Sequence, residues 1–227
     1  MQGETATFVI GENRTAFVVP LKAIENSKSI MEDRWPDNQN RTIIIGRRWQ
    51  RIPPRSFEPI AEYLRKKNFW PYLANGRFKG LGNDIKDHGH EIIVCGQVFK
   101  HAREMELTEL MLHVCNRLEA LKKEPGAVLI AAQYVFKEEM NGSDPDRLMR
   151  TLLINEIAAN YPIYMVRHAA RFFQLQKKAP DFGVQVLQKY LTILQPQIES
   201  EGVEMESESM KAQNMNMDSE QESTKSD

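Results

Sequence analysis

Cysteine is scarce in this chain, and long apolar stretches are absent from it. Its 227 residues include 2 cysteines, Cys95 and Cys115, which are too few for a framework of disulfide bonds. No run of about 18 uncharged apolar residues occurs, so no segment has the composition of a membrane-spanning helix. The first residues also lack a basic stretch followed by an apolar one, which is the pattern of a secretory signal. We therefore expect an intracellular protein, nuclear or cytoplasmic.

The sequence also lacks the motifs of common catalytic and cofactor sites. It contains no Gly-x-Ser-x-Gly, no His-Glu-x-x-His and no dinucleotide-binding fingerprint. The glycines from Gly76 to Gly82 are not followed by the lysine and hydroxyl residue of a phosphate-binding loop. Both cysteines occupy apolar positions of predicted helices, with no base beside them. We therefore predict a non-enzymatic protein without a cofactor.

Metal-ligand residue types are concentrated in one stretch, Asp87-His88-Gly89-His90-Glu91. Two histidines at this spacing can face one side, but a zinc site needs two further ligands. No second histidine pair or Cys-x-x-Cys motif supplies them nearby. We predict no metal site, and we interpret the stretch as a polar loop before a helix that begins near Glu91.

The net charge of -1 conceals an uneven distribution along the chain. Residues 199–227 hold nine acidic residues and two lysines, which gives -7 and leaves +6 for the rest. This segment has no aromatic residue, so it cannot bury enough apolar surface to offset its ordering entropy. We predict a disordered acidic tail. In it Ser219, with an acid three residues later at Glu222, has the spacing of an acid-directed phosphorylation site.

Hydrophobic periodicity predicts an α+β body. Residues 5–10 and 15–19 have the composition of a β-hairpin, a short helix follows, and residues 42–45 form a third, buried strand. Helical spacing of apolar residues predicts helices over 56–67, 91–105, 108–121, 127–138, 146–160, 162–177 and 183–194. The predicted core includes Ile44, Phe57, Leu64, Val98 and Leu112.

Proline and glycine mark the internal boundaries of the chain. Pro125-Gly126 is the clearest of them, and the composition changes again after Gln195-Pro196. We therefore predict three parts: a first domain over 1–123, a helical extension over 124–198 and the tail over 199–227.

The element order and several local sequences resemble the BTB/POZ family, especially the divergent BTB proteins of filamentous fungi. The matching pieces are ATFVIG (6–11), FVVPLKAIENS (17–27), IIIG (43–46), PRSFEPIAEYLRKKNF (54–69) and IIVCGQVFKHAREMELTELMLHVC (92–115). The resemblance implies a small sheet that caps a helical cluster, followed by an all-helical extension. The chain departs from the family pattern at Thr5, where an acidic residue is usual, and at Pro20-Leu21, where His-Lys is usual.

The resemblance implies a protein–protein interaction module, acting as a scaffold or regulatory adaptor through homo- or hetero-association. We expect a homodimer, with other proteins as further partners and no membrane. The candidate interaction surface combines apolar residues near the start of the chain with a basic stretch: Phe8, Phe17, Ile24, Ile30, Arg47, Arg48, Trp49 and Arg51. The acidic tail either stays solvated or covers the arginines of this stretch.

Two alternatives stay open. Relatives include substrate adaptors of cullin-type ubiquitin ligases, which would need a hydrophobic-x-Glu contact in the loop after the Phe57 helix. The only glutamate near that loop, Glu91, is preceded by Gly89 at the relevant spacing. The other alternative is nucleic acid, because the basic stretch from Arg41 to Arg55 surrounds Trp49, which combines charge for phosphate with a ring for base stacking. The pI near 6.5 does not favour a dedicated nucleic-acid binder.

Overall fold

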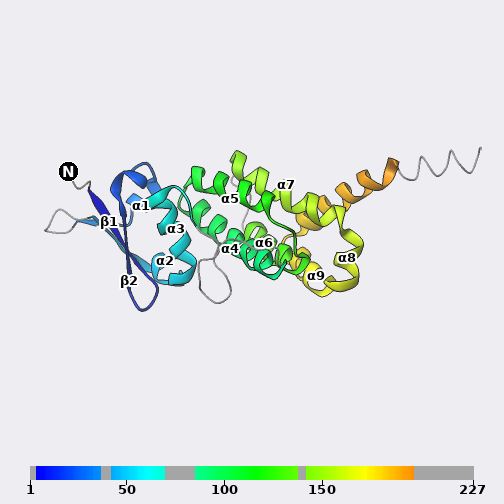
Figure 1. Ribbon diagram of the computed structural model, residues 1–227, viewed down its shortest axis with the longest axis horizontal. Coiled ribbons are helices and arrows are strands. Elements are labelled where there is room, and N and C mark those ends of the chain that lie inside the picture. The colour runs from blue at the N-terminus through cyan, green and yellow to red at the C-terminus, as the bar shows by residue number, and fades with distance from the viewer. Residues whose placement is uncertain (1–3, 37–41, 70–84, 138–141, 197–227) are drawn as a thin grey trace, which may run out of the picture.

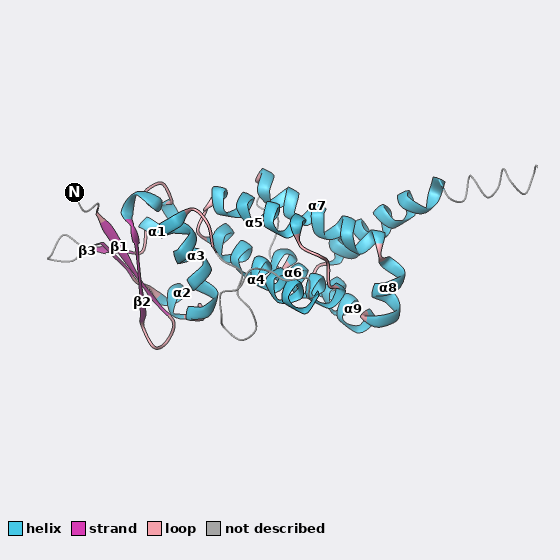
Figure 2. Cartoon of the chain, in the orientation of Figure 1, coloured by secondary structure: helices cyan, strands magenta, loops and turns pink. Residues whose placement is uncertain are grey.

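A small sheet occupies one end of the molecule, and helices make up the rest. The computed structural model describes residues 4–36, 42–69, 85–137 and 142–196. The body is elongated (Figure 1), and the strands gather at the end nearest the N-terminus (Figure 2). The predicted α+β class is confirmed, with a four-strand mixed sheet followed by a mostly helical region.

The elements follow one another in a simple order along the chain. The strands are β1 (Thr5–Ile10), β2 (Thr15–Pro20), β3 (Arg34–Pro36) and β4 (Thr42–Ile44). Between β2 and β3 lie a 3-10 turn, η1 (Leu21–Ala23), and the one-turn helix α1 (Lys28–Met31). The later helices are α2 (Arg47–Gln50), α3 (Pro54–Lys66), α4 (Ile85–Glu104), α5 (Thr108–Ala120), α6 (Pro125–Phe136), α7 (Asp144–Ala159), α8 (Tyr161–Arg167) and α9 (Ala169–Lys178). Residues 180–196 form a further helix at the end of the described chain.

The sheet has the strand order β2-β1-β4-β3. β1 is antiparallel to β2 and parallel to β4, and β3 is antiparallel to β4. The predicted hairpin is confirmed, and its turn requires Gly11, because φ is 75° and an added Cβ would lie 2.9 Å from Pro54 Cδ. The prediction of three strands was wrong. The sequence did not predict β3, because Arg34–Pro36 is three residues long and contains a proline, which is unfavourable in strand interiors.

One face of the sheet packs on α2 and α3. The Phe8 ring of β1 lies 5.0 Å from the Phe57 ring of α3 and 5.1 Å from the Trp49 ring of α2, measured between centroids. The Phe17 ring of β2 also contacts Phe57, at 5.2 Å. Aromatic pairs in this range of separations add to the free energy of burial, so this cluster fixes α3 across the inner face of the sheet.

Several helices begin earlier than apolar periodicity predicts. α3 begins at Pro54, two residues before the predicted start, because proline is well suited to the first position of a helix. α6 begins at Pro125, because the Glu124 carboxylate accepts hydrogen bonds from two backbone N–H groups at 3.0 and 2.5 Å. α4 begins at Ile85, so the polar stretch before residue 91 is helical rather than a loop.

Helix α4 packs tightly against α6 at Gly96. A Cβ added to Gly96 would lie 2.7 Å from Ala131 Cα, so the two helix backbones are nearly in contact. Buried apolar residues on both sides of residue 124 belong to one cluster, which begins at Ala6 and ends at Val186. The division of the body at residue 124 stays a prediction.

Two ion pairs connect helices inside the body. Arg103 of α4 contacts Asp146 of α7, with Nη1 and Oδ1 3.2 Å apart, and also donates to the Val135 carbonyl at 3.1 Å. Glu91 of α4 is fully buried and pairs with Arg117 of α5. Because removing one partner of a buried pair is costly, these contacts constrain which helix faces meet.

Two predictions fall on parts of the chain that the structure does not describe. The predicted disordered tail, residues 199–227, lies outside the described residues, as does the last residue of the helix predicted over 127–138. Of the described helices, none is both long and apolar enough to cross a membrane.

Four of the five predicted core residues are buried: Ile44, Phe57, Leu64 and Val98. The prediction for Leu112 was wrong, since its side chain is 46% exposed. The buried stripe of α5 instead runs through Leu110, Met111, Val114, Cys115 and Leu118. Leu112 lies off that stripe, on the solvent side of the helix.

Replacement of Phe57 by Ala should lower the free energy of unfolding by about 3–5 kcal/mol, because the ring is enclosed by three other aromatic rings. Chemical denaturation followed by circular dichroism measures this loss. Leu112→Ala is the matched control, and its exposed side chain should change stability by no more than about 0.5 kcal/mol. Equal losses in the two variants would contradict the core described above.

Replacement of Gly96 by Ala should destabilise the protein by about 1–3 kcal/mol, because the new methyl group meets the Ala131 backbone. Gly183→Ala is the control, since its methyl group meets the Gln176 side chain, which can rotate away. There the better helix propensity of Ala should leave stability unchanged or raise it by up to about 1 kcal/mol. Thermal unfolding of both variants tests the close approach, and a neutral Gly96→Ala would refute it.

Candidate interaction surfaces

Four of the eight residues predicted to form an interaction surface are core residues. Phe8, Ile24, Ile30 and Trp49 are at most 1% exposed. Their assignment to the surface is therefore corrected. Strand alternation turns Phe8 toward the helix-covered face of the sheet, and the other three side chains pack in the same core cluster. The apolar character that suggested a docking surface belongs to the interior.

The other predicted residues remain accessible to different degrees. Phe17 is half-buried against Phe57, while Arg47, Arg48 and Arg51 are exposed. The predicted apolar residues are thus buried or half-buried, whereas the predicted arginines lie at the surface. Apart from the half-buried Phe17, the three arginines in and beside α2 are what remains of the predicted surface in contact with solvent.

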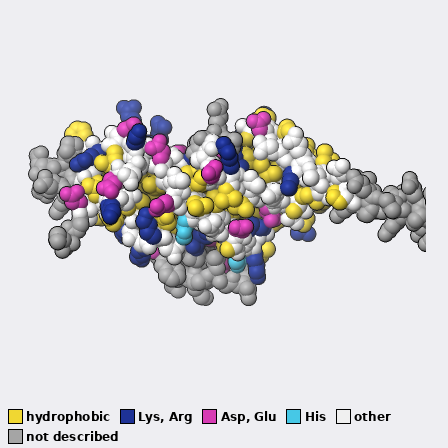
Figure 3. Space-filling view, turned by 90° about the horizontal axis from the view of Figure 1, so that it is seen from above, with side chains coloured by type: hydrophobic (Ala, Val, Ile, Leu, Met, Phe, Trp, Pro, Cys, Tyr) yellow, Lys and Arg dark blue, Asp and Glu magenta, His cyan; other side chains and the backbone are white. Residues whose placement is uncertain are grey.

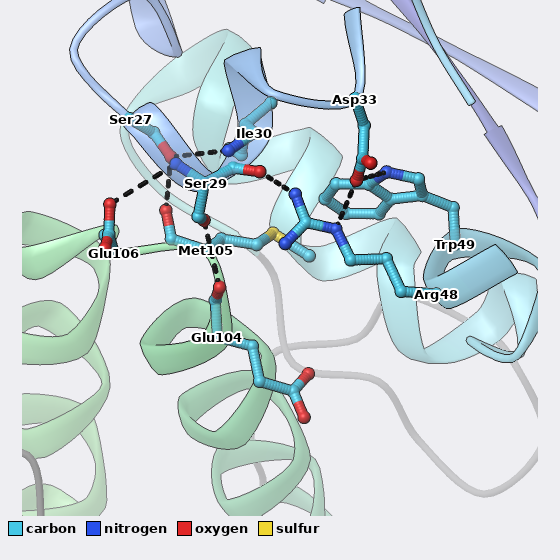
Figure 4. A network of polar contacts seen from close by, with 9 residues as sticks. All are labelled: Ser27, Ser29, Ile30, Asp33, Arg48, Trp49, Glu104, Met105 and Glu106. Atoms are coloured by element: carbon cyan, nitrogen blue, oxygen red, sulfur yellow. Dashed lines mark hydrogen bonds and ion pairs between the residues drawn. The ribbon is translucent and has the colours of Figure 1, made fainter. Parts of the chain in front are cut away.

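Arg48 and Trp49 belong to a polar network around Asp33 (Figure 4). The Asp33 carboxylate accepts a hydrogen bond from Trp49 Nε1 at 2.8 Å and pairs with Arg48 Nε at 2.5 Å. The Arg48 guanidinium also lies 4.5 Å from the centre of the Trp49 ring and donates to the Ser29 carbonyl. The network fastens α2 to the segment that joins α1 and β3.

The network continues to the turn between α4 and α5 (Figure 4). Ser27 Oγ caps α1 by accepting from the Ile30 N–H at 3.2 Å, and it donates to the Met105 carbonyl at 2.5 Å. Ser29 Oγ donates to the Glu104 carbonyl at 3.0 Å. These hydrogen bonds connect the sheet end of the protein to the C-terminal end of α4, so Arg48 and Trp49 have a structural role.

The position of Trp49 bears on nucleic-acid binding. A base-stacking ring must present one face to solvent, and the Trp49 ring is buried beneath Arg48. Arg47 and Arg51 remain exposed, but they lack the interleaved aromatic that suggested this ligand.

The outer face of the sheet carries an apolar row. No described helix covers this face, because α1, α2 and α3 all lie on the inner side (Figures 1 and 2). The pairing register places one residue of each strand in a row across it: Val18, Thr7, Ile43 and Trp35. Trp35 is 67% exposed and Val18 is 49% exposed, one at each edge of the sheet. Exposed aromatic and aliphatic side chains grouped in this way are typical of protein interfaces.

Sequence reasoning missed this row. Its alternation with buried residues is visible in β1 and β2, where Thr7 and Val18 are the outward neighbours of Phe8 and Val19. This alternation identifies the full row only once residues 34–36 are known to form a strand.

Apolar side chains are also exposed toward the opposite end of the molecule. In the space-filling view, hydrophobic side chains gather over the helical part, away from the sheet end (Figure 3). The most exposed large ones in α8, α9 and the helix over 180–196 are Ile163, Val166, Phe173, Val184 and Leu191. The helical end thus also exposes large apolar side chains, far from the row on the sheet.

Of the residues considered for metal or nucleophilic chemistry, His88, Glu91 and both cysteines are buried. Burial raises the pKa of both thiols, that of Cys95 well above its usual range and that of Cys115 to about 12. His88 Nδ1 accepts a hydrogen bond from the Lys122 N–H at 3.1 Å. In the part of the chain that the structure describes, no three His, Cys, Asp or Glu side chains are grouped to hold a metal ion.

Comparisons of this chain with protein-family models, with curated proteins and with solved structures find no match. The evidence for a functional site therefore comes from the sequence and structure of this chain.

Replacement of Asp33 by Ala should lower the free energy of unfolding by about 1–2 kcal/mol, because the buried Trp49 N–H loses its acceptor. Asp33→Asn keeps an acceptor oxygen and should recover most of this loss, since the half-exposed ion pair with Arg48 contributes little. Urea titration with tryptophan fluorescence measures both. Equal destabilisation by the two variants would show that the charge, rather than the hydrogen bond to Trp49, is what matters.

Proposed function

We propose that this chain is a non-enzymatic, BTB/POZ-like protein–protein interaction module that forms a homodimer through the outer face of its sheet. The order of elements supports the BTB-like part of the proposal. A hairpin is followed by two helical turns, the short strand β3, the strand β4 parallel to β1, the helices α2 and α3, and the paired helices α4 and α5. Apart from β3 and α2, this is the order that carried the resemblance in the sequence, and the helices from Pro125 onward correspond to the helical extension.

The observation that carries the dimer is the apolar row on the outer face. The bulky Trp35 stands at one edge of the sheet and the smaller Val18 at the other, with Thr7 and Ile43 between them. In a two-fold symmetric contact, the same patch of both copies is used and the contacts are reciprocal. Two sheets stacked face to face about an axis through the middle of the row would place each Trp35 over the Val18 of the other copy. The row is therefore complementary to itself.

The alternatives have weaker support from the described residues. Glu91 of α4, the glutamate considered for a ubiquitin-ligase adaptor contact, is fully buried and forms an ion pair with Arg117 of α5. Trp49, the ring considered for nucleic-acid stacking, is buried as well. A homodimeric module instead uses side chains that are exposed, and it leaves the helical end of each copy accessible to other proteins. This arrangement suits a scaffold or regulatory adaptor.

Sedimentation equilibrium at tens of micromolar tests the dimer, with wild-type protein expected to dimerise. Trp35→Glu and Val18→Glu should each give a monomer, because either change places an uncompensated charge against an apolar side chain of the other copy. Both side chains are exposed, so thermal stability of the monomer should be unchanged. Val166→Glu, at the opposite end, is the matched control and should remain dimeric. A monomeric wild type, or a dimer lost only in Val166→Glu, would refute the proposal.

A mixing experiment tests the symmetry of the contact. In a mixture of Trp35→Glu and Val18→Lys proteins, one contact pairs the new glutamate with the new lysine, and the other keeps the native Trp35 and Val18. Each variant alone should be a monomer, and the equimolar mixture should form heterodimers. If the mixture stays monomeric while the fold of both variants is intact, the two residues do not face each other.

A further inference from the structure

A basic pocket lies in the helical part of the chain, at the opposite end from the sheet. It has a volume of about 710 Å³ and is bordered by the end of α6, by α7 and by the start of the helix over 180–196. Four of its described lining residues are basic and one is acidic: Lys137, Arg147, Arg150 and Lys178, with Asp181. The described lining therefore has a net positive charge, which favours an anionic ligand.

The floor of the pocket is apolar and rigid. The Phe136 and Phe182 rings contact each other with centroids 5.0 Å apart, and Ile154 lies beside them in the lining. The Arg150 guanidinium is 4.8 Å from the centre of the Phe136 ring and donates to the Val135 carbonyl at 3.2 Å. Arg150 is thus held in the wall by its own contacts, and the exposed cations around it determine what binds.

Three of the cations are available to a ligand. Lys137, Arg147 and Lys178 are exposed, and none of them forms an ion pair with another described residue. Residues 180 and 181, in the first turn of the last helix, also line the pocket, and the positive end of a helix dipole favours anions. The combination of an apolar floor and exposed cations suits a peptide that carries several carboxylates and a few apolar side chains.

We propose that this pocket binds the chain's own acidic tail, through the segment 204–208. The segment reads Glu-Met-Glu-Ser-Glu, and it belongs to a tail with a net charge of -7. Its alternating glutamates would contact the basic rim, while the side chain of Met205 would lie over the apolar floor. The contact is within one chain and does not depend on the dimer at the sheet.

The length of the chain fits this contact. The helix over 180–196 is about 25 Å long, since an α-helix rises about 1.5 Å per residue. The pocket lies at the start of this helix, and the tail leaves from its other end. An extended chain covers about 3.3 Å per residue, so about eight residues lead back to the pocket and place Glu204 to Glu208 at its rim.

The return path is basic as well. Gln185 lines the pocket, and Lys189 lies one turn further along the same face of the helix. Lys189 is exposed, so it can attract Glu199 or Glu201 as the tail turns back. The arginines near α2, which were the other candidate for this tail, lie at the far end of the elongated body (Figure 1).

Spin labelling of the full chain tests the proposal. A nitroxide attached at Met205→Cys should be specific, because Cys95 and Cys115 are both buried, and wild-type protein treated in the same way is the control. At about 0.01 M salt the spectrum should show a largely immobilised label. At about 1 M salt, where the screening length falls from about 30 to about 3 Å, the immobilised fraction should drop several-fold. A label that is mobile at low salt would overturn the proposal.

Matched charge variants locate the binding site. Lys137→Gln/Arg147→Gln/Lys178→Gln should make the label mobile at both salt concentrations, whereas Arg47→Gln/Arg51→Gln should leave it immobilised at low salt. The reverse result would place the tail on the α2 arginines instead. Both sets replace exposed residues, and circular dichroism checks that the fold is kept.

Two further measurements complete the test. Zero-length carbodiimide cross-linking of the unlabelled full chain should join Lys178 or Lys137 to Glu204, Glu206 or Glu208, which keeps the proposal testable if the triple variant unfolds. Dilution of the labelled protein in the Trp35→Glu background should leave the immobilised fraction unchanged. An absence of these cross-links, or an immobilised fraction that falls on dilution, would overturn binding within one chain.

Discussion

The close contact between α4 and α6 at Gly96 is the constraint on which the rest of the structure depends. Because no side chain separates the two backbones there, α4 is buried along most of its length and also packs on α3 and α5. Its charged residues then need partners in the interior, and Glu91 and Arg103 find them on α5 and α7. Ser27 and Ser29 fasten the sheet end to the last turn of the same helix. One helix thus determines where both ends of the molecule lie.

Local periodicity was sufficient to predict much of this fold. The hairpin, α3 and the helix pair α4–α5 all carry apolar residues at the spacing of their own element, and burial of Ile44, Phe57 and Val98 followed. Elements that lack such spacing were missed. β3 is three residues long and is stabilised by pairing with β4. α2 is a single turn and is stabilised by the contacts of Trp49. Neither element is favoured by its own sequence. The apolar residues of α5 fit two adjacent stripes, and packing on α4 and α7 selects the one that excludes Leu112.

Trp35 and Trp49 show why the candidate surface could not be derived from composition. Trp49 lies among arginines and suggests an exposed binding ring, yet its N–H group is hydrogen-bonded to Asp33 and the ring is buried. Trp35 lies beside a proline in a stretch without pattern, yet it is the large aromatic that the sheet exposes. Which face a side chain takes depends on strand register, and a shift by one residue would exchange the two faces. The pairing of β3 with β4 is a long-range property, so the exposed row follows from the structure alone.

The structure, rather than the composition, also determines where charged side chains meet solvent. In the interior, Arg103 is paired with Asp146 and Arg117 with Glu91, so these arginines take up none of the surplus of +6 in residues 1–198. What remains at the surface includes two separate basic regions, one near α2 and one around the pocket beside Lys178. The stretch near α2 has the higher density of arginine in the sequence, but the chain leaves the folded body at the other end (Figure 1). A tethered segment reaches a nearby site at a high effective concentration, and this concentration falls as the tether must span a longer distance. Proximity of the pocket to the end of the last helix therefore outweighs the density of arginine near α2 in deciding which region the acidic tail meets.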